Sequence, residues 1–204
     1  DVTEHQALKV CVDTAAIDYE MAEMPEYREL AVVDHPQLKE PISRYYYTPT
    51  NSDDLIMRHE LMVAATRLGS GVIPFSHDIG ADAMNAVNIT ANMMGNKDYI
   101  ERAEKYRIML QKQDLSVACA MTDVKGDRTQ HPSSSKQTHP DYYVRVVEKN
   151  DRGIVVRGAK AHITAAAYCN EILVIPCRAM GEEDRDYAVA FAIPASTKGV
   201  VQVC

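Results

Sequence analysis

Two glycine-bearing motifs in the second half of this chain combine the residue types that a phosphate-bearing cofactor needs. The first, residues 120–128 (Ala-Met-Thr-Asp-Val-Lys-Gly-Asp-Arg), places a hydroxyl, two carboxylates and two cations around one glycine, at the end of an apolar run. A turn around Gly126 can direct backbone N–H groups at an anion, and Lys125 and Arg128 can add charge-assisted hydrogen bonds to a pyrophosphate. A charged turn between two strands would have the same composition, so both interpretations stay open at this point.

The second motif, residues 153–164 (Gly-Ile-Val-Val-Arg-Gly-Ala-Lys-Ala-His-Ile-Thr), leads from a β-branched segment through Gly158 to three polar side chains. Lys160, His162 and Thr164 could meet the polar edge of a planar ring. A single histidine is more often a structural hydrogen-bonding residue, so a purely structural role for His162 is the alternative.

The first half of the chain has the pattern of helices that would position these motifs. Helical spacing of apolar residues predicts three helices, at residues 53–67, 80–94 and 98–113. Asn51 offers an N-cap oxygen to the first of them, and Asp53 and Asp54 add negative charge to its first turn. Glu101 and Lys105 are four residues apart, so we expect an ion pair on the surface of the third helix.

Beyond residue 114 the pattern changes to short runs rich in Val, Ile and Tyr. The expected strands are residues 142–148, 154–157, 172–175, 187–193 and 200–203. Gly and Pro residues between these runs fit hairpins, so we expect largely antiparallel strands, with a surface loop at residues 130–140. Helices followed by strands predict an α+β fold, with a helical domain at residues 1–114 and a β-domain at residues 115–204.

Composition excludes several classes of protein. A chain of 204 residues with 46% hydrophobic and 25% charged residues is typical of a globular protein. A net charge of -7 without any basic run argues against a nucleic-acid-binding surface, and the apolar runs are too short to cross a membrane. The five cysteines are scattered and form no CxxC pair, which is typical of reduced thiols, so we expect a cytoplasmic enzyme.

From residue 42 to residue 199 the chain resembles the flavoprotein family that unites 4-hydroxybutyryl-CoA dehydratase (vinylacetyl-CoA isomerase) with 4-hydroxyphenylacetate 3-monooxygenase. Besides the two motifs, the matching pieces are Ile42-Ser-Arg44, Ser52-Asp-Asp-Leu55, Gly80-Ala-Asp-Ala-Met-Asn-Ala86 and Asn170-Glu-Ile-Leu-Val-Ile-Pro176. The resemblance implies an acyl-CoA dehydrogenase-like fold, with an N-terminal helical domain, a mostly antiparallel β-barrel-like middle domain and a C-terminal helical bundle. In that family the bundle closes the active site and builds a homotetramer. The chain is therefore expected to be a fragment without the bundle.

The resemblance also implies an FAD site built by the two motifs. The cofactor-binding residues that it implies are Met121, Thr122, Asp123, Lys125, Gly126, Asp127, Arg128, Lys160, His162 and Thr164. By position, Met121 and Thr122 are similar to family residues that touch the isoalloxazine ring, and residues 125–128 to those nearer the diphosphate or ribityl chain. A hydroxyl or N–H group at His162 or Thr164 could donate to the flavin N5 or O4 and so tune its reduction potential.

The chain departs from both branches of the family close to residue 80. The dehydratases carry two cysteines, four residues apart, that bind part of a 4Fe–4S cluster, and the equivalent positions here are Pro74 and Asp78. Neither residue supplies a thiolate. In the monooxygenases an Arg and a Tyr hold and activate the phenol, and the equivalent positions here are Ile79 and Ala83.

No metal site is assigned from these residues. His77, Asp78 and Asp82 could offer an imidazole and two carboxylates to a divalent metal. A helix cap and a solvated surface are the more common role of such residues near a helix start, and this is the role that we expect.

We expect an FAD-dependent enzyme that acts on a CoA thioester, because both motifs look more like the dehydratase branch. The expected chemistry is removal, addition or relocation of hydrogen next to the thioester carbonyl, and the missing cysteine pair favours isomerisation or another flavin-only reaction. The alternatives are a monooxygenase that takes reduced FAD from a partner reductase and hydroxylates a phenol, and a non-catalytic family member. No catalytic residue is assigned, because the catalytic acid and base are expected beyond Cys204.

Overall fold

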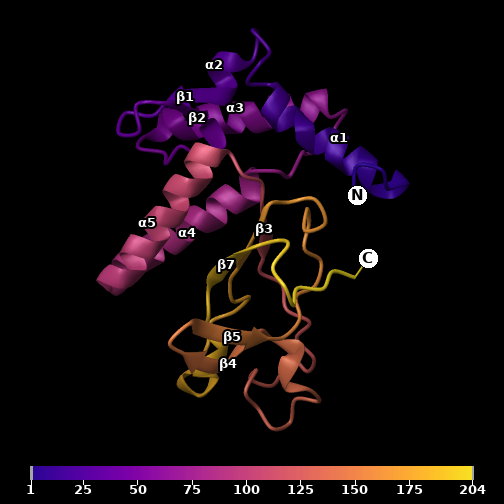
Figure 1. Ribbon diagram of the computed structural model, residues 1–204, viewed down its shortest axis with the longest axis vertical. Helices are drawn as coiled ribbons and strands as arrows, with labels where there is room; N and C mark the ends of the chain where they lie inside the picture. Colours follow the sequence, from indigo (N-terminus) through magenta and orange to yellow (C-terminus); the bar gives the residue numbers. More distant parts are fainter. Residues whose placement is uncertain (1, 204) are drawn as a thin grey trace.

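The computed structural model describes residues 2–203, in which the helices and most of the strands occupy opposite ends of an elongated molecule (Figure 1). The helices are α1 (Gln6–Glu20), α2 (Arg28–Ala31), α3 (Ser52–Leu68), α4 (Asp78–Met94) and α5 (Lys97–Gln113). Short 3-10 helices are η1 (Arg44–Tyr46), η2 (Pro140–Tyr142) and η3 (Glu182–Tyr187). The strands are β1 (Val32–Asp34), β2 (Pro41–Ser43), β3 (Val117–Ala120), β4 (Arg145–Asn150), β5 (Gly153–Arg157), β6 (Glu171–Val174) and β7 (Phe191–Pro194).

The three predicted helices are confirmed, each to within two residues at either end. Helix α3 begins at the predicted cap, where the Asn51 side chain accepts a hydrogen bond of 3.0 Å from the N–H of Asp54. The expected ion pair on α5 is also present, with 2.6 Å between Lys105 Nζ and Glu101 Oε1. Helix α1 and the antiparallel pair β1–β2 were not delimited by the sequence pattern.

The strands differ from the prediction in how they pair. Strand β6 lies between β3 and β7, parallel to β3 and antiparallel to β7, and β4 and β5 form a separate antiparallel hairpin. The expected antiparallel pairing is confirmed for β4–β5 and β6–β7, and β3–β6 is a parallel exception. Among residues 2–203 no closed barrel is formed, so the expected β-barrel-like arrangement is wrong. Strands β3 and β6 are apolar runs that are buried along nearly their whole length, and such runs are typical of parallel strands.

Two strand predictions were wrong at their start, and a third was wrong altogether. The expected strands 142–148 and 187–193 begin later, at Arg145 and Phe191, because η2 and η3 precede them. Tyr143 and Tyr187 are buried there and pack edge to face, with ring centroids 6.4 Å apart. Residues 200–203 form no strand, and Val201 and Val203 are 81% and 90% exposed.

One hydrophobic core crosses the predicted division at residue 114. It joins Leu61 of α3, Met84 of α4 and Leu110 of α5 to Val117 of β3 and Leu173 of β6. The division therefore marks a change of secondary structure within continuous packing.

The N-terminal end of α4 lies directly on β3 because residue 80 is a glycine. A Cβ atom at Gly80 would lie 2.5 Å from both the Cβ and the carbonyl oxygen of Val117, closer than real Cβ atoms approach. This contact sets the helical part of the chain against β3, the strand that leads into the first glycine-bearing motif.

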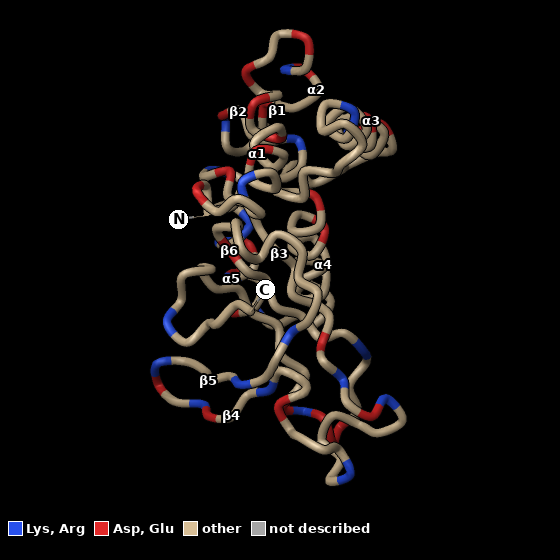
Figure 2. The backbone as a smooth tube through the Cα atoms, turned by 90° about the vertical axis from the view of Figure 1, so that its right-hand side faces the viewer, with Lys and Arg blue, Asp and Glu red and all other residues tan. Residues whose placement is uncertain are grey.

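Charged residues of both signs are found in the helical part and in the strand-rich part (Figure 2). No helix among residues 2–203 combines the length and the apolar character that a membrane-spanning helix requires.

Candidate functional site

The two glycine-bearing motifs lie side by side, as the sequence predicts. The N–H of Ala161 donates a 2.9 Å hydrogen bond to the carbonyl of Thr122, and Asp123 and Lys160 form an antiparallel bridge. The first motif leaves the end of β3, and the second leaves β5 and leads towards β6. Residues about 40 positions apart in the chain are thereby brought to one place.

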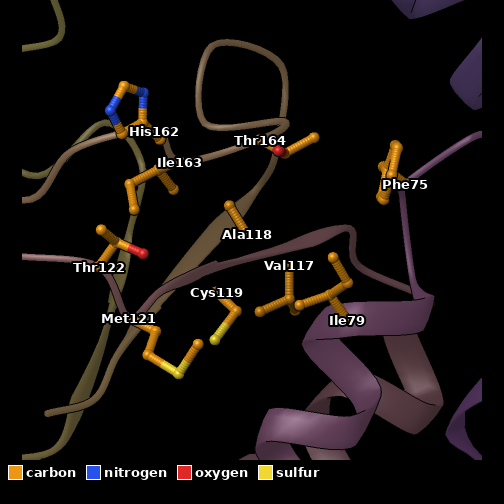
Figure 3. A pocket seen from close by; sticks show the side chains of 10 residues that line it. All are labelled: Phe75, Ile79, Val117, Ala118, Cys119, Met121, Thr122, His162, Ile163 and Thr164. Carbon is orange, nitrogen blue, oxygen red and sulfur yellow. The ribbon is translucent and has the colours of Figure 1, made fainter. Parts of the chain in front are cut away.

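A pocket of about 170 Å³ opens between these motifs and the start of α4 (Figure 3). Its lining residues are Phe75, Ile79, Val117, Ala118, Cys119, Met121, Thr122, His162, Ile163 and Thr164. Four of the ten predicted cofactor-binding residues, Met121, Thr122, His162 and Thr164, are therefore brought together here. In Figure 3 Phe75 and Ile79 form one side of the pocket, and His162 and Thr122 lie on the other.

The pocket is mainly apolar, with polar atoms at only a few places. Hydroxyl groups come from Thr122 and Thr164, and an imidazole comes from His162. Burial raises the pKa of the Cys119 thiol, although the nearby Lys160 opposes this, so the thiol stays protonated and unreactive at neutral pH. An apolar cavity with a few polar groups is typical of sites for small molecules and cofactors.

Two of the lining residues have a backbone conformation that is uncommon outside glycine. Phe75 has a φ of 59° and His162 a φ of 57°, both in the left-handed region. Such conformations persist only where the surrounding structure holds them, and they cluster at functional sites. Their occurrence on two sides of one pocket supports a functional role for it.

Lys160 lies outside the pocket, and its ammonium group is bound by three oxygens of the protein. Nζ lies 2.8 Å from Oδ1 of Asp123 and donates to the carbonyls of Met121 at 3.0 Å and Ile175 at 2.9 Å. The side chains of Lys160 and Asp123 are only 11% and 2% exposed. This buried pair holds the backbone of Met121, a residue that lines the pocket, so Lys160 and Asp123 support the pocket without lining it.

Residues 125–128 also lie outside the pocket, in a turn packed against residues 137–142. The N–H of Lys125 donates to the carbonyl of Tyr142, and the N–H of Asp127 donates to the side chain of Gln137. These two amides are therefore not free for an anion. Gly126 has a φ of 52°, and a Cβ atom there would lie 2.4 Å from the Tyr142 ring, which explains the glycine by packing.

The carboxylate and the cations of this turn differ in their surroundings. Oδ1 of Asp127 accepts hydrogen bonds from the N–H and the hydroxyl of Thr129, so it stabilises the turn. The side chain of Arg128 is exposed, and that of Lys125 is half-buried.

Pro74 and Asp78, which the sequence analysis matched to the cluster cysteines, offer no thiolate to an iron–sulfur cluster. Pro74 has no side-chain donor atom. Asp78 is buried, its Oδ1 accepts a 3.0 Å hydrogen bond from the N–H of Ile79, and burial raises its pKa. The alternative metal site fails as well, because His77 faces Asp18 and Asp114 while Asp82 pairs with Arg58 at 2.8 Å.

In the described part of the chain, one group of three residues has the spacing of metal ligands, and it lies outside the pocket: His131, Glu183 and Asp184. Nδ1 of His131 is 3.0 Å from Asp184 and 3.2 Å from Glu183. Asp184 also accepts a hydrogen bond from the N–H of Ser133, so the group ties the loop after residue 130 to η3.

Sequence reasoning missed part of the pocket. Residues 117–119 belong to the apolar run that ends at the first motif, and extending that motif by one strand would have included them. Phe75 carried no such signal, because phenylalanine is not a residue from which a left-handed turn is expected.

The family model described as 4-hydroxyphenylacetate 3-hydroxylase N terminal matches residues 1–204. The chain is 34% identical over 203 residues to 4-hydroxybutyryl-CoA dehydratase/vinylacetyl-CoA-Δ-isomerase of Clostridium aminobutyricum, covering 98% of this chain and 41% of the relative. It is 29% identical to the oxygenase component of 4-hydroxyphenylacetate 3-monooxygenase of Thermus thermophilus, covering 100% of this chain and 41% of that protein.

Solved structures agree with these relatives. An oxygen-tolerant archaeal 4-hydroxybutyryl-CoA dehydratase from N. maritimus superimposes with a TM-score of 0.89 at 29% identity, over 97% of this chain and 39% of that one. The oxygenase component of 4-hydroxyphenylacetate 3-monooxygenase complexed with FAD gives a TM-score of 0.85 at 29% identity, over 98% and 40%. The chain thus spans about 40% of the length of the proteins that it matches.

Proposed function

Because the chain belongs to the 4-hydroxyphenylacetate 3-hydroxylase N-terminal family, we propose that it is part of an FAD-dependent enzyme whose flavin ring meets the pocket at Met121, Thr122, His162 and Thr164. The observation that carries this proposal is the convergence of both motifs on one mainly apolar pocket. It is supported by the similarity to an oxygenase structure complexed with FAD. A volume of about 170 Å³ is small beside the 300–1,000 Å³ of typical ligand sites, so this part of the chain would hold only one edge of the cofactor.

The residues of the pocket suit a planar ring with polar atoms on its rim. When bound, FAD supplies a ring that can accept an electron or a hydride. The hydroxyls of Thr122 and Thr164 would donate hydrogen bonds to the rim, and Val117, Ile163 and Met121 would exclude water from the ring face. The exposed cation of Arg128, with Lys125, would approach the diphosphate from outside the pocket.

For the substrate we propose a CoA thioester, on which the enzyme relocates a hydrogen next to the carbonyl. The dehydratase relative is more similar to this chain, at 34% identity against 29% for the monooxygenase. Pro74 and Asp78 do not fit a 4Fe–4S cluster, which favours double-bond isomerisation over dehydration. No catalytic acid or base is assigned; among the residues that line the pocket, only His162 and Cys119 carry ionisable side chains.

A phenol monooxygenase is the second candidate. One of the matching oxygenase structures contains FAD and 4-hydroxyphenylacetate and superimposes with a TM-score of 0.85. Against it stand Ile79 and Ala83, whose side chains cannot pair with a phenolate as an Arg and a Tyr would.

The test uses the full-length protein from its native source. Flavin is measured by anaerobic absorbance and iron by chemical assay, followed by isomerisation of vinylacetyl-CoA. Bound FAD, no iron and isomerase activity are the expected results. A fully occupied cluster would contradict the interpretation of Pro74 and Asp78, and oxygen-dependent hydroxylation of a phenol with supplied reduced FAD would favour the second candidate. Absence of FAD binding would overturn both and leave a non-catalytic member of the family.

A further inference from the structure

The segment between the pocket residues Phe75 and Ile79 is buried and carries a histidine among charged groups. His77 is 0% exposed. Its Nδ1 lies 3.5 Å from Oδ2 of Asp18 in α1, and its Nε2 lies 3.1 Å from Oδ1 of Asp114, the C-cap residue of α5. The hydroxyl of the neighbouring Ser76 donates a hydrogen bond to the same oxygen of Asp18 and lies 3.1 Å from Nδ1 of His77, so it bridges the two side chains.

Three tyrosine rings enclose the imidazole. Tyr45 is stacked on it with a centroid distance of 5.6 Å and an interplanar angle of 4°, while Tyr46 meets it edge-on at 5.3 Å. Tyr19 is tilted against it at 4.7 Å. An aromatic face attracts a cation, so the stacked Tyr45 ring favours the protonated form of His77.

The charges around His77 favour the same form. The Asp18 side chain is 1% exposed, and a neutral imidazole would leave its carboxylate buried without a cationic partner, which is costly. Burial alone lowers the pKa of His77, but the carboxylates of Asp114 and Asp18 raise it to about 9 overall. The other charged groups close by are Asp78, next in the chain, and Arg58 of α3, which donates to the Asp78 carbonyl.

The same segment holds one side of the pocket in place. Phe75, with its left-handed backbone, immediately precedes Ser76 and His77, whose side chains contact Asp18 and Asp114. The carbonyl of Ser76 accepts a 3.1 Å hydrogen bond from the N–H of Val117 in β3, and the carbonyl of His77 accepts one of 2.7 Å from Ala81 in α4. Side chain and backbone of residues 76 and 77 are thus both tied to neighbouring elements.

We propose that His77, as an imidazolium held between Asp18 and Asp114, is a positioning residue that fixes Phe75 and Ile79 against the pocket. It does not line the pocket, so it acts through those two residues. The inference rests on the proposed function insofar as the pocket is taken as a flavin site, but its effect on the segment can be measured without FAD.

The first experiment measures hydrogen exchange by mass spectrometry in peptides that cover residues 72–82 of the full-length protein. His77→Gln removes the cation and is expected to speed exchange in these peptides at least tenfold. His59→Gln, the same change on the exposed face of α3, is the matched control and is expected to leave them unchanged. The double variant His77→Gln/Asp114→Asn removes one carboxylate as well and is expected to restore part of the protection, since Asn tolerates the left-handed backbone at position 114.

Unchanged exchange in His77→Gln would overturn the proposal. Equal loss of protection in the single and double variants would overturn the charge argument, because a purely steric role predicts no recovery.

The second experiment follows the melting temperature of the same proteins from pH 6 to pH 10. The folded-state pKa of about 9 lies above the ordinary value of 6.5, so the stabilisation is complete below pH 6.5 and is lost as the pH rises through 9. We expect the wild type and His59→Gln to lose melting temperature over this range, and His77→Gln to lack that step. A wild type without the step would overturn the proposal even if His77→Gln fails to fold.

The third measurement is FAD affinity, which is expected to fall at least fivefold in His77→Gln. A wild type that binds no FAD would refute the flavin site. Hydrogen exchange and melting temperature would still decide the role of His77 in that case.

Discussion

Replacing Lys160 by methionine separates two interpretations of the second motif. If Lys160 contacted the cofactor, its loss would weaken FAD binding and leave stability nearly unchanged. In the structure its ammonium group instead neutralises the buried carboxylate of Asp123 and binds the carbonyls of Met121 and Ile175. Removing one partner of a buried pair costs roughly 3–5 kcal/mol, because the other charge stays buried and uncompensated. We therefore expect Lys160→Met to lower the free energy of unfolding by about that amount.

The control is Lys9→Met on α1. Lys9 and Asp13 form an ion pair of the same 2.8 Å length, but their side chains are 58% and 60% exposed. Exposed pairs contribute about 0–1 kcal/mol, so this variant is expected to be close to the wild type. The second comparison is Lys160→Met/Asp123→Asn, which removes both charges and is expected to recover part of the loss.

Chemical denaturation of the full-length protein, followed by fluorescence with and without FAD, measures these differences. A Lys160→Met variant as stable as Lys9→Met would refute the structural role. Independent, additive effects of the changes at positions 160 and 123 would refute the pairing itself.

Three further variants test other parts of the site and fold. Gly126→Ala is expected to lower stability about 1–3 kcal/mol more than Gly95→Ala in the same denaturation assay, because both glycines have a left-handed φ but only the first would place a Cβ against the Tyr142 ring. Thr164→Val is expected to weaken FAD binding roughly 2- to 10-fold through loss of one hydrogen bond, measured by equilibrium titration against Thr90→Val, whose hydroxyl bonds only to its own helix. Asn51→Ala removes the cap of α3 and is expected to cost about 1 kcal/mol of stability without changing FAD affinity; no loss of stability would show that the cap is dispensable.

The helices could be predicted from sequence where local chemistry decides their ends. Asn51 caps α3 with its own side chain, and that signal is visible within four residues of sequence. Helix α1 has no equivalent: His5 makes no side-chain capping bond, and the first turn holds no acidic residue. Its position depends instead on packing against the rest of the protein, which a local pattern does not contain.

The strand pairing could not be predicted in the same way. Runs at β3 and β6 were correctly identified as apolar, but nothing in either run specifies a parallel partner. That choice depends on the path of the residues between them. Likewise, Tyr143 and Tyr187 have residue types that favour strands, yet burial against each other places them outside the strands.

For the candidate site, the structure brings the two motifs together but places their side chains in different surroundings. Met121, Thr122, His162 and Thr164 do line one pocket. Lys160 and Asp123 were predicted to face a cofactor, and they face each other. A pattern of residue types shows which charges are present, but only the fold determines whether two opposite charges satisfy each other or a ligand.

The parallel pairing of β3 with β6 also constrains the order in which the chain acquires its structure. Ser116 and Asn170, which are hydrogen-bonded just ahead of the two strands, are 54 residues apart, whereas α4 and α5 contact each other through neighbouring sequence. Closing so long a loop costs conformational entropy before the strand contacts contribute any stabilisation, so such non-local pairings slow folding. During synthesis the helices can therefore assemble early, but β3 has no strand partner until residue 174 has left the ribosome. During that interval α4 can already pack on one face of β3, but the backbone edge that later pairs with β6 has no partner. An unpaired strand edge of this kind can pair with other chains, so the nascent chain needs protection from aggregation there.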